Sequence, residues 1–135
     1  MKAVESNYNA EKLIESELTG EIVGAAIEVH KRMGPGLLES VYEECLLKEL
    51  DIRGIPASSQ VKVPLVYKGE ELKTSLIINL LVGDKVIIEI KSVAEILPVH
   101  RAQILTYLKL TGKRIGFLLN FNVPKLMEGL ERFAL

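Results

Sequence analysis

This chain of 135 residues lacks several features that would indicate particular classes of protein. Its single cysteine, Cys45, excludes an internal disulfide and a metal site rich in cysteine. A formal net charge of -1 gives no overall attraction to nucleic acid, so such a ligand would need a local basic patch. The sequence has no apolar run as long as a membrane span, and residues 1–18 are too polar for a signal peptide. We therefore expect a cytoplasmic protein that does not enter a membrane.

The composition is that of an ordinary globular protein, with 48% hydrophobic and 26% charged residues. A chain of this length can bury one core without disulfides or metals, so we expect residues 1–135 to form a single domain. Residues 1–16 are expected to be flexible or loosely packed. Cys45 lies in a helical pattern and is expected to be a buried, inert thiol.

The first part of the chain predicts two helices with a strong break between them. Apolar residues at helical spacing predict a helix over 18–33, with Thr19 as its N-cap. The sequence Gly34-Pro35-Gly36 ends it, and a second helix is predicted over 37–53. His30, one turn before the break, is expected to be a hydrogen-bonded structural residue.

The remainder of the chain predicts a mixed sheet, which places the protein in the α/β class. Three strands should form an antiparallel meander, and a fourth should join in parallel through a crossover helix. Pro64 interrupts the first strand, which is therefore expected at an edge. Long apolar runs in later strands indicate cover on both faces. The predicted elements are strands over 60–67, 72–82 and 86–91, a helix over 98–110, a strand over 113–121 and a short helix from Pro124.

The third predicted strand contains a carboxylate and an ammonium within an apolar run. Because side chains alternate along a strand, Glu89 and Lys91 share one face while Ile88 and Ile90 share the other. A carboxylate can bind a hard cation, and a nearby lysine can orient or help deprotonate a water molecule. The alternative is a salt-bridged strand with one solvated face.

A polar residue on the preceding strand extends this pattern. If the loop between the two strands has three residues, Asn79 lies opposite Glu89 on the same face. A loop of two residues would instead set Asn79 opposite Ile88. The alternative role for Asn79 is an amide that is hydrogen-bonded within a dry sheet.

The predicted helices contribute further polar groups. Glu39 falls in the first turn of the second helix, where a carboxylate also stabilises the helix dipole. His100, Gln103 and Tyr107 share one face of the later helix. Taken singly, they are also consistent with a solvated histidine, a surface glutamine and a partly buried tyrosine.

In their order along the chain, these residues resemble the PD-(D/E)XK nuclease superfamily. The pattern is a helical Glu, a polar residue on one strand, Glu-x-Lys on the next, and Gln-x-x-x-Tyr on the following helix. More closely, the chain is similar to the bacterial and archaeal proteins called GxxExxY, a motif found here as Gly36, Glu39 and Tyr42. The similarity runs over about residues 18–132 and includes Val29-His30-Lys31, Gly34-Pro35-Gly36 and Gly116–Phe121.

The resemblance implies a restriction-endonuclease-like core that hydrolyses DNA or RNA with weakly bound Mg²⁺ or Mn²⁺. It implies that Glu39, Glu89 and the backbone carbonyl of Ile90 bind the metal. Lys91 would orient the attacking water or stabilise charge on the phosphate. Gln103 and Tyr107 would position the substrate backbone or the lysine.

One position departs from the superfamily pattern. The superfamily has Asp where this chain has Asn79, so the metal would gain a neutral amide oxygen in place of a carboxylate. We therefore expect weak metal binding and a slow or inactive nuclease. The alternatives are a nucleic-acid-binding module without catalysis and a protein-interaction module that forms a symmetric homodimer. The candidate nucleic-acid contacts are Lys31, Arg32, Arg101, Lys109, Lys113 and Arg114.

Overall fold

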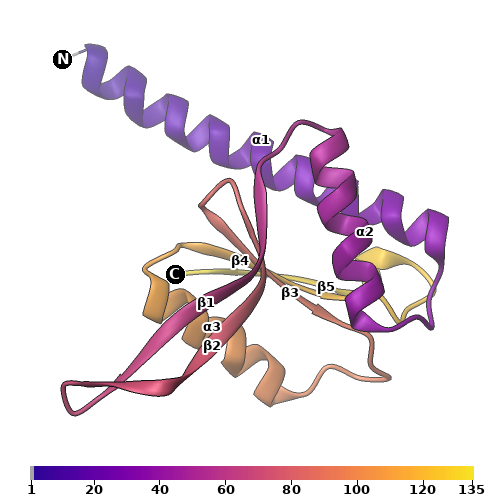
Figure 1. Cartoon of the computed structure of the whole chain (residues 1–135). Coiled ribbons are helices and arrows are strands. Elements are labelled where there is room, and N and C mark those ends of the chain that lie inside the picture. The colour runs from indigo at the N-terminus through magenta and orange to yellow at the C-terminus, as the bar shows by residue number, and fades with distance from the viewer. Residues whose placement is uncertain (1) are drawn as a thin grey trace.

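A computed structural model describes residues 2–135, with side chains from residue 15 onward (Figure 1). Five strands form one sheet in the order β1-β2-β3-β4-β5. All neighbouring strands are antiparallel except β3 and β4, which are parallel and are joined through α3. The elements are α1 (Lys2–Met33), α2 (Glu39–Ile52), β1 (Ala57–Tyr67), β2 (Glu70–Val82), β3 (Val86–Lys91), α3 (Pro98–Thr111), β4 (Ile115–Asn120), the 3₁₀ turn η1 (Leu126–Gly129) and β5 (Leu130–Ala134).

Helices cover both faces of the sheet. On one face, α1 and α2 pack on the larger apolar cluster, to which Ile88 and Ile90 of β3 belong. On the other face, α3 packs on a second cluster that includes Ile87 and Leu118. Strand β3 is buried through Ile90 and β4 is buried throughout, which confirms the prediction from their apolar runs.

The first helix differs from its prediction. It begins at Lys2, and Thr19 lies inside it, where its hydroxyl donates a hydrogen bond to the carbonyl of Ser16 at 3.0 Å. The N-cap prediction was therefore wrong, because residues 2–17 contain neither proline nor glycine and continue the helix. Residues 1–16 were predicted to be flexible or loosely packed, and most of their side chains lie outside the described part of the structure.

The C-terminal segment also differs from its prediction. In place of a terminal helix, it forms η1 and then β5, so the sheet has five strands and not four. In β5, Leu130 packs on the larger cluster and Phe133 on the second. This change of face is typical of an edge strand that contributes to both cores.

Two smaller predictions have opposite outcomes. Strand β1 lies at an edge of the sheet, as Pro64 indicated. Cys45 is only half-buried, which corrects the expectation of a fully buried thiol. It lies at the margin of the inner stripe of α2, where Tyr42, Leu46 and Leu50 take the buried positions.

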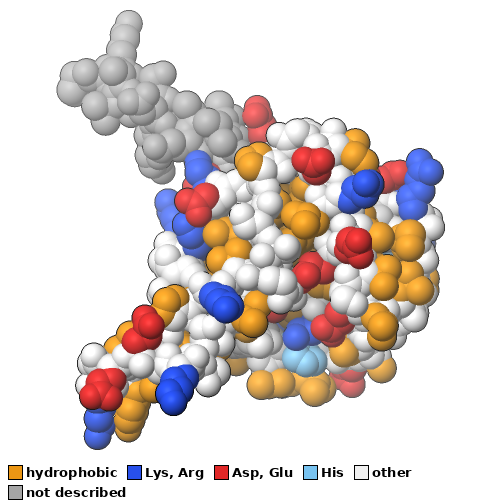
Figure 2. Space-filling model, in the orientation of Figure 1, with side chains coloured by type: hydrophobic (Ala, Val, Ile, Leu, Met, Phe, Trp, Pro, Cys, Tyr) orange, Lys and Arg blue, Asp and Glu red, His pale blue; other side chains and the backbone are white. Residues whose placement is uncertain are grey.

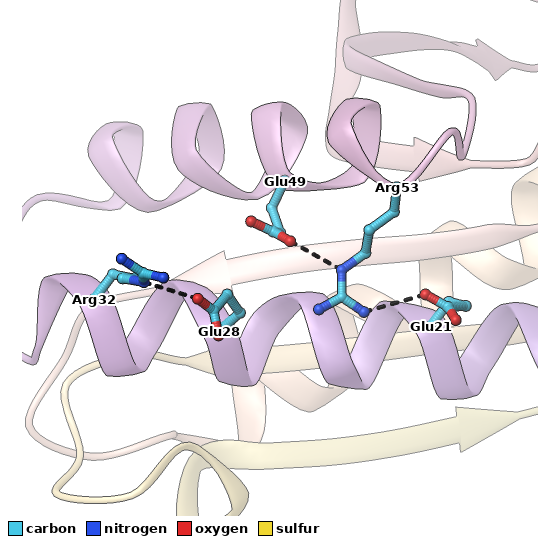
Figure 3. A network of polar contacts seen from close by, with 5 residues as sticks. All are labelled: Glu21, Glu28, Arg32, Glu49 and Arg53. Carbon is cyan, nitrogen blue, oxygen red and sulfur yellow. Dashed lines mark hydrogen bonds and ion pairs between the residues drawn. The ribbon is translucent and has the colours of Figure 1, made fainter.

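Charged side chains also join α1 to α2 (Figure 3). Arg53, just beyond α2, contacts Glu49 of its own helix at 2.9 Å and Glu21 of α1 at 3.1 Å. Arg32 pairs with Glu28 within α1 at 2.8 Å. Exposed pairs of this kind contribute little to stability, so the apolar cluster holds the two helices together.

The tyrosine of the Gly-x-x-Glu-x-x-Tyr motif has a structural role. The Tyr42 hydroxyl donates a hydrogen bond to the carbonyl of Gly34 and accepts one from the N–H of Leu37 at 3.1 Å. Its ring stacks on Phe121, with 4.4 Å between centroids. Tyr42 therefore holds the loop that precedes Glu39 and sets where α2 begins.

Replacing Tyr42 with phenylalanine should lower the free energy of unfolding by about 1–2 kcal/mol, because two partly buried backbone groups lose their partner. Urea unfolding followed by circular dichroism measures the change. Tyr67→Phe is the matched control, since Tyr67 is 64% exposed and should be neutral. Equal effects of the two substitutions would contradict this role of Tyr42.

Candidate active site

The candidate site lies where β2 and β3 stop pairing. Val82 pairs with Val86 across a three-residue loop, which confirms the register predicted from that loop length. The regular pairing ends at Leu80 and Ile88. Beyond them, the Asn79 N–H donates to Glu89 Oε1 at 3.3 Å, and the Ile90 N–H donates to Asn79 Oδ1 at 2.8 Å. The Asn79 side chain therefore replaces a backbone partner and bridges the two strands.

The alternation of side chains changes at this point in β2. Leu80 and Val82 face the larger cluster, whereas Leu76 and Ile78 pack with the second. Both pairs have even numbers, so the strand reverses its faces at Asn79. Asn79 thus points along the sheet toward β3, and it does not stand beside Glu89 on one face as a regular ladder would require.

Glu89 is a buried carboxyl group, with 4% of its surface exposed. Burial raises its pKa from 4.5 to about 7, with smaller increases from the charges of Glu39 and Glu43. The hydrogen bond from Asn79 and the charge of Lys91 act in the opposite direction. These four neighbours come from three elements, so the structure brings the predicted Glu39, Asn79, Glu89 and Lys91 together.

Helix α2 brings two carboxylates to this region. Glu39 is exposed, and its Oε1 accepts a hydrogen bond from the Ser92 N–H at 3.4 Å. Glu43, one turn later, is half-buried and accepts bonds from Asn79 Nδ2 at 2.9 Å and Gln60 Nε2 at 2.7 Å. Sequence reasoning missed Glu43, although its spacing of four residues from Glu39 places both on one helix face.

The chain around Lys91 is held in place by backbone contacts. The Lys91 carbonyl accepts a hydrogen bond from the Phe121 N–H at 3.0 Å. The Ser92 hydroxyl donates to the Leu37 carbonyl at 2.6 Å. The buried Asn120 amide accepts from the Val93 N–H at 3.1 Å and donates to the Val93 carbonyl at 3.0 Å. Because the loop at Leu37 and the end of β4 both hold this backbone, the half-buried Lys91 side chain starts from a defined position.

Helix α3 places its tyrosine beside Glu89. Gln103 Nε2 donates a hydrogen bond to the Tyr107 hydroxyl at 2.9 Å, so these two predicted residues act as a pair. Burial raises the pKa of the Tyr107 phenol, and the charge of Glu89 raises it further. His100 on the same helix has a local role, because its Nδ1 accepts the Leu97 N–H at 2.9 Å.

His30 fits its predicted structural role. It is 7% exposed, and its Nε2 lies 2.7 Å from the carbonyl oxygen of Val123. The ring is also stacked at 6.3 Å from Phe121. His30 therefore joins α1 to the segment after β4, and its position serves the fold.

The chemistry of this cluster suits a hard divalent cation. Mg²⁺ favours a few carboxylate oxygens together with retained water molecules, and here the single positive charge of Lys91 lies among the carboxyl groups of Glu39, Glu43 and Glu89. Within the part of the chain with described side chains, no three acidic, histidine or cysteine residues are placed to hold a metal ion. The arrangement therefore suits an ion bound by one or two carboxylates and water, which would be weakly held.

Figure 2 shows acidic and basic side chains mixed on the face that α2 crosses. Three of the basic residues proposed as nucleic-acid contacts form internal pairs: Arg32 with Glu28, Arg101 with Glu131, and Lys113 with Asp84. Their charges are thereby partly offset by these neighbouring carboxylates.

A comparison with protein-family models finds a match to the PD-(D/E)XK nuclease superfamily over residues 16–133. The chain belongs to the PD-(D/E)XK nuclease superfamily. No curated protein and no solved structure matches the chain. The five-stranded mixed sheet between helices is the restriction-endonuclease-like fold that the resemblance predicted.

Membership of the nuclease superfamily supports a nuclease-like fold and, since these nucleases generally use divalent metals, a metal-dependent ancestry. The matched range contains all the candidate residues from Glu39 to Tyr107. No helix among the described residues is long and apolar enough to span a membrane.

Two pockets lie away from the candidate cluster. The larger, of about 830 Å³, lies between the later turns of α2 and the start of β1, with Lys48, Asp51 and Ser58 in its wall. The smaller, of about 500 Å³, lies beside His30 and Pro124. Neither is lined by Glu39, Glu89 or Lys91.

Proposed function

We propose that this PD-(D/E)XK protein is a metal-dependent phosphodiesterase that cleaves DNA or RNA and is slowed by Asn79. The observation that supports it best is the buried Glu89 beside Lys91, with Glu39 and Glu43 close enough for their charges to act on it. Within the superfamily, we assign the chain to the GxxExxY proteins. We also keep the prediction of a cytoplasmic location.

The proposed roles follow from position. Glu39, Glu89 and the carbonyl of Ile90 would hold Mg²⁺ or Mn²⁺, with Asn79 contributing at most a neutral oxygen. The bound ion would polarise a phosphoryl oxygen and make its own water more acidic. Lys91 would orient the attacking water and offset charge on the phosphate. Tyr107, hydrogen-bonded to Gln103, would contact the substrate backbone.

The local charge explains why a metal would be required. Three carboxyl groups (Glu39, Glu43 and Glu89) lie near one ammonium group, that of Lys91. Such a surface repels a phosphate backbone unless a cation intervenes. This favours the nuclease over the alternative of a module that binds nucleic acid without metal. A homodimer acting in protein interaction stays a third alternative, tested by light scattering.

Cleavage assays with Mg²⁺ or Mn²⁺ on labelled single- and double-stranded DNA and RNA test the proposal. We expect slow cleavage, a loss of at least about tenfold in Lys91→Ala, and an increase of about tenfold or more in Asn79→Asp. The restored carboxylate should also tighten Mg²⁺ binding in calorimetry. Lys73→Ala, which removes an exposed lysine of β2 that is not among the candidate nucleic-acid contacts, is the control.

Two outcomes would overturn the proposal. One is no cleavage of any substrate by the parent and by Asn79→Asp. The other is Lys91→Ala activity equal to that of the parent. Salt-dependent binding without cleavage, and without a need for metal, would support the nucleic-acid-binding module in its place.

A further inference from the structure

A chain of hydrogen bonds connects Glu43 of α2 to Glu89 of β3. Gln60 Nε2 and Asn79 Nδ2 both donate to Glu43 Oε1, at 2.7 and 2.9 Å. On its other side, Asn79 accepts the Ile90 N–H at 2.8 Å, and its own N–H meets Glu89 Oε1 at 3.3 Å. The Asn79 side-chain amide therefore links Glu43 to the backbone of β3, and the Asn79 backbone N–H contacts Glu89 on the same strand.

A carboxylate at position 43 determines which way the Asn79 amide points. A carboxylate only accepts hydrogen bonds, so it must face the NH₂ group, and the amide oxygen must then face the Ile90 N–H. We propose that Glu43 is a positioning residue for Glu89 that acts through Asn79, whose side-chain amide binds Glu43 and whose backbone N–H contacts Glu89. This inference rests on the proposed function, because it assigns a role within that site.

Gln60 strengthens this arrangement from the edge strand. Its backbone has φ of 53°, an unusual value for a residue other than glycine. Strain of this kind persists only where surrounding contacts hold it, and here the Gln60 side chain reaches Glu43. One oxygen of Glu43 thus accepts two hydrogen bonds, and these bonds join α2 to strands β1 and β2.

The pairing also explains how the chain accommodates Asn79. An aspartate at this position would still accept the Ile90 N–H with one carboxylate oxygen. Its second oxygen would face Glu43 in the place of the Asn79 Nδ2 donor, which lies 2.9 Å from Glu43 Oε1. Without a cation, these like charges would repel. The Asn79 amide donor and the Glu43 carboxylate acceptor are therefore complementary, and the residues of the site can pack together without a metal ion.

The first test measures solvent exchange of the Asn79 side-chain amide protons by NMR, which needs no metal. In Glu43→Gln, the new amide allows the Asn79 amide to turn, and we expect exchange to become at least about tenfold faster. Glu44→Gln is the matched control, since it makes the same change on the adjacent, exposed residue of α2 and should leave exchange unchanged. Gln60→Ala removes one donor and should give an effect of about threefold.

The second test measures the dissociation constant for Mn²⁺ in the same variants. Glu43→Gln should raise it about tenfold and Glu44→Gln should not change it. A purely structural role of Glu43 would instead lower the melting temperature and leave the Mn²⁺ affinity of the folded protein unchanged. If Glu43→Gln fails to fold, Gln60→Ala replaces it in both measurements, with about threefold changes expected.

The two tests separate failure of this inference from failure of the proposed function. Parental exchange rates in Glu43→Gln, or parental Mn²⁺ affinity in that variant, would overturn the positioning role. A parent protein that binds no Mn²⁺ at millimolar concentration would overturn the metal-dependent function. In that case the NMR result alone decides whether Glu43 holds Asn79.

Discussion

In metal-free buffer, Glu89 should make the protein about 3 kcal/mol less stable at pH 8 than at pH 4.5. Its pKa is about 7 in the folded protein and 4.5 in its ordinary, exposed state. Between these values the folded state keeps a proton that the unfolded chain releases. The contribution is therefore fully present below about pH 4.5, declines as the pH rises toward 7 and is absent above it.

Glu89→Gln should remove this dependence, because the neutral amide oxygen can still accept the Asn79 N–H without a buried charge. At pH 8 the variant should be more stable than the parent by about 2–3 kcal/mol. Urea unfolding in EDTA from pH 4.5 to 8.5 measures both proteins, and the difference between them isolates Glu89. The groups that face Glu89 are Asn79, Glu39, Glu43, Lys91 and Tyr107.

Glu44→Gln is the control for the pH series. Glu44 is exposed, so its loss should not alter how the free energy of unfolding changes with pH. Adding Mg²⁺ should stabilise the parent at pH 8 and have little effect on Glu89→Gln, because binding to the folded state alone is stabilising. Parallel stability curves for the parent and Glu89→Gln would contradict the elevated pKa.

Gly129→Ala should destabilise the protein by about 3 kcal/mol or more. A Cβ at Gly129 would lie 2.1 Å from the backbone oxygen of Asn120 and 3.1 Å from Val123 Cγ2. A backbone atom cannot move aside as a flexible side chain can, so η1 and the end of β4 must separate. Asn120 also holds the backbone at Val93, which carries the disturbance to the segment after Lys91.

Gly20→Ala is the matched control, because it adds the same methyl group in an open position. A Cβ there meets no atom of the described residues within 4 Å, apart from the helix's own nearby backbone. Alanine in an exposed helix is favoured over glycine by about 1 kcal/mol, so this variant should be slightly more stable than the parent. Thermal unfolding of the two variants should therefore shift in opposite directions. An unchanged melting temperature in Gly129→Ala would contradict the predicted clash with the Asn120 backbone.

Much of the site could be predicted because it depends on local periodicity. The shared face of Glu89 and Lys91 follows from strand alternation, and the pairing of Val82 with Val86 follows from the length of one loop. Glu43 was missed because its role depends on two amides that reach it from different strands. The reversal of faces at Asn79 has no counterpart in a regular alternating pattern, so sequence alone could not give it.

The errors in the fold have similar causes. Thr19 is a good helix cap by residue type, but a cap also requires the preceding chain to leave the helix. The last strand was missed because only five residues form it, and Leu130 and Phe133 belong to different clusters. Edge strands of this length give a weak periodic signal.

The outer edge of β1 affects how the protein behaves at high concentration. An exposed strand edge is a template on which another molecule's strand can add, leading to fibrils or precipitation. Here Pro64 lacks a backbone donor, the pairing with β2 shifts between Pro64 and Val66, and Lys62 is exposed. These features interrupt the row of backbone hydrogen-bonding groups along the edge. Aggregation by strand addition at β1 is therefore disfavoured, even though β1 and β2 are long strands.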